Sequence, residues 1–399
     1  MIDVQGQDDR KDQGSRKDSP YYTRALQGDS SYSRGDPYTR PDPWRSPCEE
    51  EEPRKIAIFR ALYMGDLLLA VPALRAIRAR FPRAEITLIG LPWAATFARR
   101  FSSYIDRFVE FVGHPGITEV EIEPEREQRF LAEQRAYGYD LVIQMHGSGR
   151  TSNPFTLALN GRMTVAYYEG TPTRGLTLGL PYPQDMPEVE RNLGLAKLLG
   201  CSELDPRLEF PLLPADRVEA AKLLLKLPRG RPRIGLHAGA KAPARRWPAA
   251  YFARVADYLV QHFNAQIILT GSTHEAATIR SVVEHMRTRP YNLAGQTSFG
   301  GLAGLINELD LFISNDTGPA HIANALDTPG VTIFGPVDPR RWASADQARH
   351  PFVRRAVPCS PCAHWECPID HRCLRWISPD EVIKVARQLL VKGNVACSA

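Results

Sequence analysis

The sequence predicts an α/β protein built from two successive domains, each a parallel sheet flanked by helices. Short apolar runs typical of buried strands alternate with stretches that repeat apolar residues at helical spacing. The alternation restarts after a proline-rich connection over residues 180–214, and 399 residues are enough for two domains of ordinary size. Because strands that alternate with helices form parallel sheets, we expect a ligand cleft where the carboxyl ends of the two sheets face each other.

The composition excludes several classes of protein. With 43% hydrophobic and 24% charged residues, the chain can bury a large core, which rules out a wholly disordered or collagen-like chain. No apolar run approaches the roughly 20 residues that span a bilayer, and the N-terminus is polar and lacks a secretory apolar segment. We therefore expect a cytoplasmic protein.

The charge is distributed unevenly along the chain. Residues 1–53 carry 12 acidic and 8 basic side chains and so have a net charge of −4. Because the whole chain has a net charge of +5, the remaining residues carry +9. The same segment contains only three Ile, Leu, Val or Phe residues, too few to offset the entropy of ordering, and we predict a disordered tail there. The basic remainder suits an anionic substrate, a membrane surface or a nucleic acid, and charge alone selects none of them.

Residues 54–213 are expected to form the first domain. Each expected strand is a short apolar run and each expected helix repeats apolar residues every three or four positions. The expected strands are Ile56–Phe59, Glu85–Ile89, Arg107–Val112 and Asp140–Met145. The expected helices are Leu67–Arg80, Pro92–Phe101, Glu125–Tyr137 and Val189–Leu199.

Residues 214–358 repeat this organisation as the second domain. The expected strands are Arg233–His237, Gln266–Thr270, Asp310–Ser314 and Val331–Phe334. The expected helices are Ala215–Leu227, Ala249–Phe263, His274–Arg287 and Thr317–Leu326. A cysteine-rich loop over residues 359–376 and a C-terminal helix over residues 377–399 complete the chain.

Two loops of the second domain have the chemistry of a phosphate site. The segment Ser314–His321 joins a strand to a helix, where free backbone N–H groups at the positive end of the helix dipole favour an anion. The loop His237–Pro248 carries Lys241, Arg245 and Arg246, enough positive charge for a diphosphate. A capped helix end and solvated cations are the plainer interpretations of these two loops.

The first domain offers polar groups at two strand ends. Asp66 follows the first expected strand, near a helix start, where the helix dipole alone would also account for a carboxylate. The segment Gln144–Arg150 follows the last expected strand, and its His146 and Arg150 face the expected cleft. A hydrogen-bonded loop histidine is an equal interpretation of His146.

Taken together, these motifs resemble glycosyltransferase family 9, whose best-known members are the lipopolysaccharide heptosyltransferases. The resemblance covers about residues 55–390, and its most specific part is Asp316-Thr-Gly-Pro-Ala-His321. Supporting segments are Arg60 with Gly65-Asp66, then Arg245-Arg-Trp-Pro248 and Phe334-Gly-Pro336. The resemblance implies a GT-B architecture: two Rossmann-like domains, the first for the acceptor and the second for the nucleotide sugar.

The resemblance also implies roles for individual residues. Asp66 matches the proposed general base. The residues expected to bind the acceptor are Arg60 and Gly65 of the same motif, with His146 and Arg150. Arg245 stands where the family commonly has a lysine that binds the donor diphosphate. The other matched donor-side positions are Asp316, Thr317, Gly318 and His321 around the sugar and diphosphate, Glu275 at the ribose and Thr297 near the adenine.

The implied reaction is inverting sugar transfer that requires no cofactor. The implied partners are a nucleotide-sugar donor, most simply ADP-heptose, and a lipopolysaccharide inner-core acceptor, with peripheral contact at the inner face of the cytoplasmic membrane and no nucleic acid. Arginines 75, 78, 80, 83, 99 and 100 are candidates for contact with the phosphorylated acceptor. No residue that we can name identifies heptose, so another nucleotide sugar or glycan acceptor is the nearer alternative.

Four cysteines cluster beyond these motifs. Cys359, Cys362, Cys367 and Cys373 follow a C-x2-C-x4-C-x5-C pattern, and four thiolates so close in sequence suit structural Zn or Fe. The spacing is not that of a standard zinc finger, so unligated or redox-active thiols are an equal alternative; cysteine-rich loops in some family 9 enzymes, one of them iron-binding, favour the metal.

Two rival functions come from other classes. A nicotinamide oxidoreductase typically has three glycines, in the pattern G-x-G-x-x-G, in the first strand–helix turn. This turn has only Gly65. A noncatalytic metal-binding regulatory module built on the cysteine-rich loop is the other rival.

Overall fold

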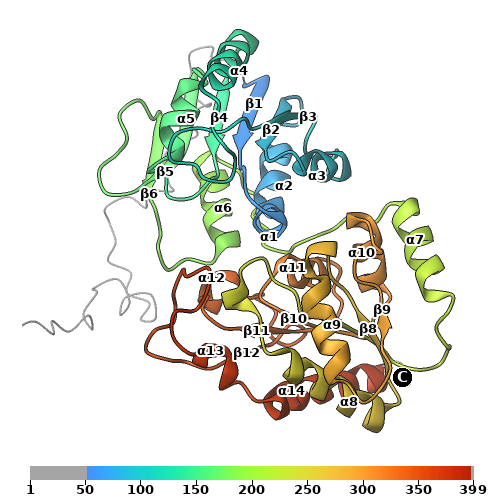
Figure 1. Cartoon of the computed structure of the whole chain (residues 1–399). Coiled ribbons are helices and arrows are strands. Elements are labelled where there is room, and N and C mark those ends of the chain that lie inside the picture. The colour runs from blue at the N-terminus through green and yellow to red at the C-terminus, as the bar shows by residue number, and fades with distance from the viewer. Residues whose placement is uncertain (1–51, 397–399) are drawn as a thin grey trace, which may run out of the picture. The chain divides into compact units, whose positions relative to one another are not determined.

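Two six-stranded parallel sheets form the frame of the chain, of which the computed structural model describes residues 52–396 (Figure 1). The predicted disordered tail therefore falls, apart from its last two residues, outside the described residues. The first sheet has the order β3-β2-β1-β4-β5-β6. Its strands are β1 (Lys55–Phe59), β2 (Glu85–Gly90), β3 (Arg107–Glu110), β4 (Leu141–Gln144), β5 (Met163–Tyr168) and β6 (Leu178–Pro181).

The helices of the first half connect these strands. They are α1 (Met64–Leu68), α2 (Val71–Arg80), α3 (Ala94–Arg100), α4 (Pro124–Tyr137), α5 (Ser152–Ala158) and α6 (Glu188–Leu198). The single helix expected over residues 67–80 is divided into α1 and α2. Pro72 explains the division, because proline has no N–H to bond the preceding turn and is tolerated only at a helix start.

The second half repeats the first. Its sheet has the order β12-β11-β10-β7-β8-β9, with β7 (Arg233–His237), β8 (Gln266–Leu269), β9 (Tyr291–Asn292), β10 (Leu311–Asn315), β11 (Gly330–Phe334) and β12 (Phe352–Arg354). Its α-helices are α7 (Pro214–Leu224), α8 (Ala249–Phe263), α9 (Ala276–His285), α10 (Phe299–Asn307), α11 (Gly318–Ala325), α12 (Pro339–Trp342), α13 (Arg372–Arg375) and α14 (Pro379–Ala396). Two short 3-10 turns are η1 (Pro243–Arg245) and η2 (Thr273–Glu275).

Both sheets have the strand order of a Rossmann fold, in which the connections reverse direction between the first and fourth strands. The reversal lies between β1 and β4 in the first sheet and between β7 and β10 in the second. Ligands of open α/β sheets bind at the carboxyl ends of the strands at such a point. The prediction of two Rossmann-like domains is confirmed; the boundary expected at residues 213–214 stays a prediction, since it lies in the connection between the last strand of one sheet and the first of the other.

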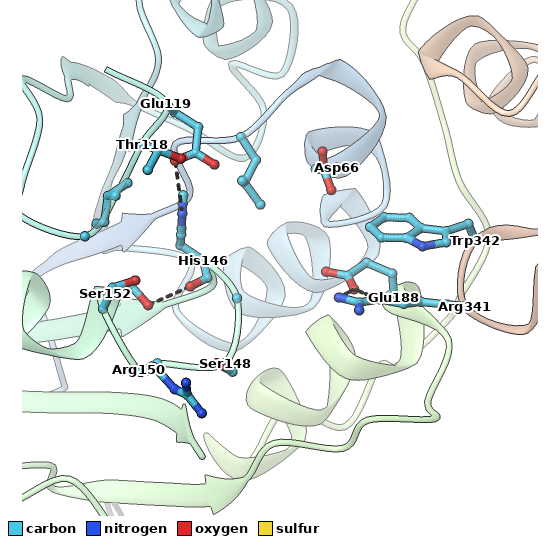
Figure 2. A pocket seen from close by; sticks show the side chains of 16 residues that line it. Asp66, Thr118, Glu119, His146, Ser148, Arg150, Ser152, Glu188, Arg341 and Trp342 are labelled. Carbon is cyan, nitrogen blue, oxygen red and sulfur yellow. Dashed lines mark hydrogen bonds and ion pairs between the residues drawn. The ribbon is translucent and has the colours of Figure 1, made fainter. Parts of the chain in front are cut away.

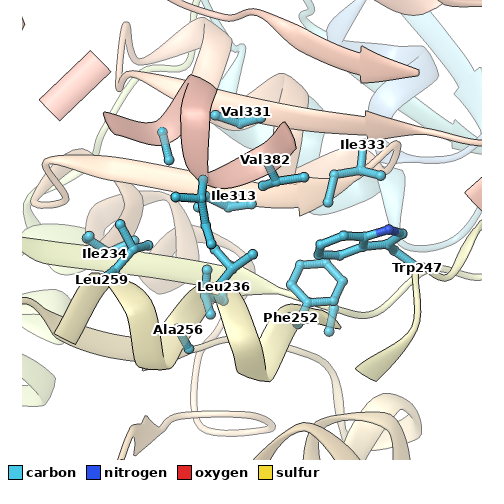
Figure 3. Close-up of a cluster of buried hydrophobic side chains, with 14 of the residues drawn as sticks. Ile234, Leu236, Trp247, Phe252, Ala256, Leu259, Ile313, Val331, Ile333 and Val382 are labelled. Atoms are coloured by element: carbon cyan, nitrogen blue, oxygen red, sulfur yellow. The ribbon is translucent and has the colours of Figure 1, made fainter. Parts of the chain in front are cut away.

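Trp247 anchors the core of the second half (Figure 3). Its side chain is 1% exposed, meets the ring of Phe252 edge-on at 5.1 Å between centroids, and donates Nε1–H to the carbonyl of Ile377. Val382 of α14 joins the same cluster, which packs on the sheet residues Ile313 and Ile333. The core thus holds the strand ends of the second sheet in fixed positions.

A buried ion pair joins the two halves away from the strand ends. Arg100 of α3 bonds both carboxylate oxygens of Asp216 in α7, with 3.0 Å between Nη2 and Oδ1, and both side chains are less than a tenth exposed. Arg100 also donates to the carbonyl of Pro211 and lies over the ring of Phe299. Gly300 permits this approach, because a Cβ there would lie 1.8 Å from Asp216 Oδ1.

Several elements went unpredicted because their local signals are weak. β9 and β12 have two and three residues, too short to show a pattern, and β6 ends in a proline that suits only a sheet edge. α10 contains adjacent glycines, which lower helix propensity. Among the described residues, no helix combines the length and apolarity that a membrane span requires.

Candidate functional site

The predicted site residues lie at the reversal points of both sheets. Asp66 follows β1 and His146 follows β4, while the loop with Lys241 and Arg245 follows β7 and Asp316 follows β10. Two cavities lie against these strand ends, one of about 340 Å³ on the first half and one of about 350 Å³ on the second. The expected cleft is therefore present.

Asp66 lines both cavities. It sits in the first turn of α1. Within the part of the chain that the structure describes, Trp342 of α12 is the only other residue that lines both cavities. Figure 2 shows both side chains at the first cavity. Burial raises the pKa of the Asp66 carboxyl, Arg60 opposes this, and the carboxylate of Glu188 adds to it. A carboxylate with a raised pKa between two cavities has the position and basicity of a general base.

Arg60 lies behind Asp66 and lines neither cavity. Its side chain is buried, with Nε donating to the Asp66 carbonyl at 2.9 Å and Nη2 donating to Glu188 Oε1 at 3.1 Å. Its Nη1 donates to the carbonyl of Met145 and to Asn192 Oδ1. These bonds occupy the guanidinium, so the expected direct acceptor contact of Arg60 is replaced by a positioning role.

Glu188, which the sequence analysis did not identify, forms ion pairs with arginines from both halves. It pairs with Arg60, with Arg191 one helical turn along α6, and with Arg341 of α12 at 3.2 Å between Nη2 and Oε2. Burial raises the pKa of the Glu188 carboxyl, but the three guanidinium groups outweigh it and lower the pKa overall. Arg341 also donates to the hydroxyl of Tyr182 at 2.7 Å.

His146 forms the inner wall of the first cavity. Its ring stacks on Phe59 at 5.0 Å, its Nδ1 accepts from the N–H of Ala61, and its Nε2 faces Glu119 at 3.9 Å (Figure 2). Burial, reinforced by Arg60, lowers the pKa of His146 to about 4, so the imidazole is neutral at pH 7.

Arg150 lines the outer part of the same cavity. Its guanidinium is 74% exposed and pairs with Glu169 at 3.0 Å. Gly149 beside it has a positive φ of 88°, and a Cβ there would lie 2.3 Å from the carbonyl of Tyr167. The loop therefore needs glycine to bring His146 and Arg150 onto the cavity.

The second cavity gathers most of the predicted donor side chains. It is lined by Lys241, Arg245, Asp316, Thr317, Gly318 and His321 together with Asp66. Arg245 Nη1 lies 3.4 Å from Asp316 Oδ2. Burial raises the pKa of Asp316 to about 6 against the effect of Arg245, and burial lowers the pKa of His321 to about 4.

Gly65 and Gly318 allow α1 and α11 to approach each other. A Cβ on Gly65 would lie 2.8 Å from His321 Cδ2, and one on Gly318 would lie 3.1 Å from Met64 Cε. Lys241 lies over the ring of Tyr63 at 3.3 Å, a further contact between the halves. The small residues of the two motifs thus place Asp66 against the donor-side cavity.

Three predicted donor residues do not line this cavity. Arg246 turns back to donate to the carbonyl of Ala240, which supports the loop. Glu275 caps η2 and faces His237 at 3.7 Å, and a Cβ on Gly239 would lie 2.1 Å from its Oε1. Thr297 precedes α10 and is half-buried. Glu275 therefore adjoins the start of the β7 loop, beside the cavity and not in its lining.

The four clustered cysteines differ in exposure. Cys359 is exposed, Cys362 and Cys367 are half-buried, and Cys373 is buried. Burial and the neighbouring cysteines raise the pKa of the Cys373 thiol to about 11. Within residues 52–396, no three His, Cys, Asp or Glu side chains are arranged to hold a metal ion, so the described geometry does not reproduce the four-thiolate site expected from the spacing.

The arginines proposed for acceptor contact lie elsewhere. None of arginines 75, 78, 80, 83, 99 and 100 lines either central cavity. Arg75 bonds Asp205 and Glu209, Arg78 bonds Asp106, and Arg100 is buried against Asp216. Sequence position could not reveal these partners, which are 28 to 134 residues away. Contact of this set with the acceptor stays a prediction.

Known proteins are similar to this chain in sequence. The family model described as glycosyltransferase family 9 (heptosyltransferase) matches residues 128–372. The lipooligosaccharide heptosyltransferase 2 of Campylobacter jejuni serotype O:2 is 31% identical over 350 residues, which cover 86% of this chain and all of that protein.

Two solved structures have a similar fold. A family 9 glycosyltransferase from Veillonella parvula is 23% identical with a TM-score of 0.71, over 85% of this chain and 98% of that one. The ADP-heptose LPS heptosyltransferase II of E. coli is also 23% identical, with a TM-score of 0.66, over 85% of this chain and 99% of that one. Together with two Rossmann-like sheets and cavities that meet at Asp66, these matches lead to one conclusion: the chain belongs to glycosyltransferase family 9 and is a glycosyltransferase of GT-B architecture.

Proposed function

We propose that this enzyme transfers heptose from ADP-heptose to a hydroxyl of the lipopolysaccharide or lipooligosaccharide inner core, with inversion at the anomeric carbon. The heptosyltransferase activities for which the C. jejuni and E. coli relatives are named support the donor and the acceptor class. The observation that carries the proposal is that Asp66 lines two cavities at once, one with cations and Asp316 and the other with His146 and Arg150.

In the proposed mechanism the acceptor occupies the first cavity and the donor the second. Asp66 removes the proton from the acceptor hydroxyl while its oxygen forms a bond to the anomeric carbon, and the bond to the diphosphate oxygen breaks on the opposite face. The negative charge then gathers on the nucleoside diphosphate. Lys241, Arg245 and the N-terminal end of α11 would stabilise that charge.

Glu275 and Thr297 keep their expected roles as nucleoside contacts within this proposal. Both lie on the second half outside the cavity that holds Asp316, so the nucleoside would extend from that cavity past Gly239 towards η2. The proposal assigns no step of the transfer to a metal, as the family resemblance implies. Cytoplasmic action and peripheral contact with the inner face of the membrane are proposed from the acceptor class alone.

Membership of family 9 excludes the oxidoreductase and the noncatalytic module as rivals. Another nucleotide sugar or acceptor remains the alternative to ADP-heptose. The test is a transfer assay with purified full-length enzyme, ADP-heptose and lipopolysaccharide from a strain that lacks inner-core heptose, followed by mass spectrometry of the glycan. The expected result is a mass gain of one heptose; transfer from UDP- or GDP-sugars with none from ADP-heptose would overturn the donor assignment.

A further inference from the structure

The cysteine-rich segment is bound to two of the loops that line the donor-side cavity, the one that follows β11 and the one that follows β7. On one side the N–H of Cys362 donates to the carbonyl of Pro336 at 2.8 Å, and Ser360 Oγ donates to the carbonyl of Gly335 at 3.1 Å. Gly335 and Pro336 follow β11 directly. The segment is thereby fixed to one of the motifs that identify the family.

On the other side the segment holds the turn η1. The N–H of Ala244 donates to the carbonyl of Trp365 at 3.0 Å, and the carbonyl of Ala244 lies 2.7 Å from His371 Nε2. Both polar groups of one peptide residue are thus bonded to the cysteine-rich segment. Since Arg245 follows Ala244 directly, the segment fixes the backbone that carries a diphosphate-binding candidate.

Residues Cys362 to Trp365 form part of the cavity lining itself. They share the cavity of about 350 Å³ with Asp66, Arg245 and Asp316. Trp365 is 55% exposed, so its indole is accessible at the edge of this cavity. The predicted nucleoside contacts Glu275 and Thr297 are absent from this lining, so the segment faces the part of the donor that lies beyond the nucleoside.

We propose that His364 and Trp365 form a wall of the donor-sugar subsite and help to select the transferred sugar. The inference rests on the proposed function, because it places a nucleotide sugar in this cavity. An indole face packs well on the C–H face of a sugar ring, and an imidazole can hydrogen-bond a hydroxyl. Such contacts discriminate between sugars that differ in size or in one hydroxyl, which the diphosphate-binding groups do not.

The first test is protection of Cys362 from alkylation. Full-length protein is treated with iodoacetamide alone, with ADP, or with ADP-heptose, UDP-glucose and GDP-mannose in turn, and the labelling rate of each cysteine is measured by mass spectrometry of the tryptic peptide. Cys359 is the internal control, since it is exposed and outside the cavity lining. A nucleotide sugar that stabilises the fold should slow labelling of Cys362 at least about 5-fold more than ADP does, with Cys359 unchanged.

The second test compares two exposed tryptophans of the same segment. Trp365→Ala should weaken binding of the nucleotide sugar by about 10-fold while ADP binding stays within 2-fold, and Trp365→Phe should restore most of the loss. Trp376→Ala is the matched control, because Trp376 is 54% exposed but lies outside the cavity. Affinities are measured by titration calorimetry, and thermal unfolding verifies the fold of each variant.

The two tests separate the possible failures. If no nucleotide sugar stabilises the wild-type protein, the proposed function fails and the subsite with it. If a nucleotide sugar binds the wild type but neither protects Cys362 nor loses affinity in Trp365→Ala, the sugar wall is refuted and the proposed function stands. An equal loss for ADP and the nucleotide sugar would also refute it, since the segment would then act only by supporting Arg245.

Discussion

Glu188 of α6 and Arg341 of α12 lie 153 positions apart and form an ion pair of 3.2 Å that joins the two halves beside Asp66. Glu188 also holds Arg60, whose Nε bonds the carbonyl of Asp66. The position of the candidate base is therefore linked to the second half by a short chain of charged contacts. This link makes domain arrangement and base position mutually dependent.

Replacing Arg341 by methionine should lower activity more than stability. Arg341 is about one-third exposed, so its ion pair is expected to contribute under about 1 kcal/mol to folding, while its loss frees the halves to separate near Asp66. We expect kcat/KM to fall by about 10-fold or more, because small misplacements of a base are costly. Steady-state kinetics and thermal unfolding measure the two effects. Arg340→Met is the control, since Arg340 pairs with Asp338 within the same turn; equal losses in both variants would contradict the prediction.

Replacing Asp66 by asparagine should abolish proton removal while keeping the shape of the site. We expect turnover to fall by about 100- to 10,000-fold with donor affinity nearly unchanged, the range typical for loss of a general base. Single-turnover kinetics and calorimetric titration with the donor separate these quantities. Asp205→Asn, at an exposed pair with Arg207, should behave as wild type. Turnover within a few-fold of wild type in Asp66→Asn would show that another group takes the proton.

The buried pair of Arg100 and Asp216 should dominate the stability of the contact between the halves. Asp216→Asn leaves the guanidinium of Arg100 buried with the negative charge of its partner removed, which is expected to cost about 3–5 kcal/mol of unfolding free energy. Asp380→Asn breaks the exposed pair with Arg254 and should cost under about 1 kcal/mol. Urea denaturation of both variants tests this contrast, and similar midpoints would disprove it.

His321 should make the protein sensitive to mild acid. Its pKa is lowered to about 4 by burial, below the ordinary value of 6.5, so the unfolded chain binds the proton more readily. The resulting stability is complete above pH 6.5 and is lost as pH falls towards 4, with a magnitude of up to roughly 3 kcal/mol. Urea denaturation between pH 4 and 7 should show a shallower acid slope for His321→Asn than for wild type.

Asp316 should have the opposite effect on the pH dependence of stability over part of the same pH range. Its pKa is raised to about 6 by burial, so its charge costs stability above pH 6 and that cost is relieved as pH falls. Asp316→Asn should therefore steepen the acid slope that His321→Asn flattens. The acid slopes of both variants are compared with that of the wild type by urea denaturation between pH 4 and 7. Slopes parallel to the wild type in both variants would refute both assignments.

Local sequence predicted the fold and the centre of the site for a common reason. Strand runs, helical spacing and the loops at strand ends are local patterns, and the topology brings such loops together, so Asp66 and Asp316 could be expected to share a cavity. Glu188 and Arg341 carry no local signal, because their significance arises only from a contact between distant segments.

Burial explains where other expectations went wrong. The family resemblance placed Arg60 on the acceptor side, yet its guanidinium is buried and donates hydrogen bonds to four protein oxygens. The cysteine spacing left a metal site and unligated thiols equally open, and the structure places Cys362 to Trp365 in the lining of a cavity. The direction in which a side chain points depends on the conformation of its loop, and the spacing of residues in the sequence does not determine that conformation.

The shared border of the two cavities bears on regiochemistry. Among the described residues only Asp66 and Trp342 border both spaces, so the acceptor hydroxyl that reacts is one that reaches this border. The enzyme would then select among neighbouring hydroxyl groups of the acceptor by which of them comes within bonding distance of the anomeric carbon. It would not need a separate protein contact for each hydroxyl. Replacing Trp342 by a smaller residue should open this border, and we expect mixed linkages in the product before any loss of turnover.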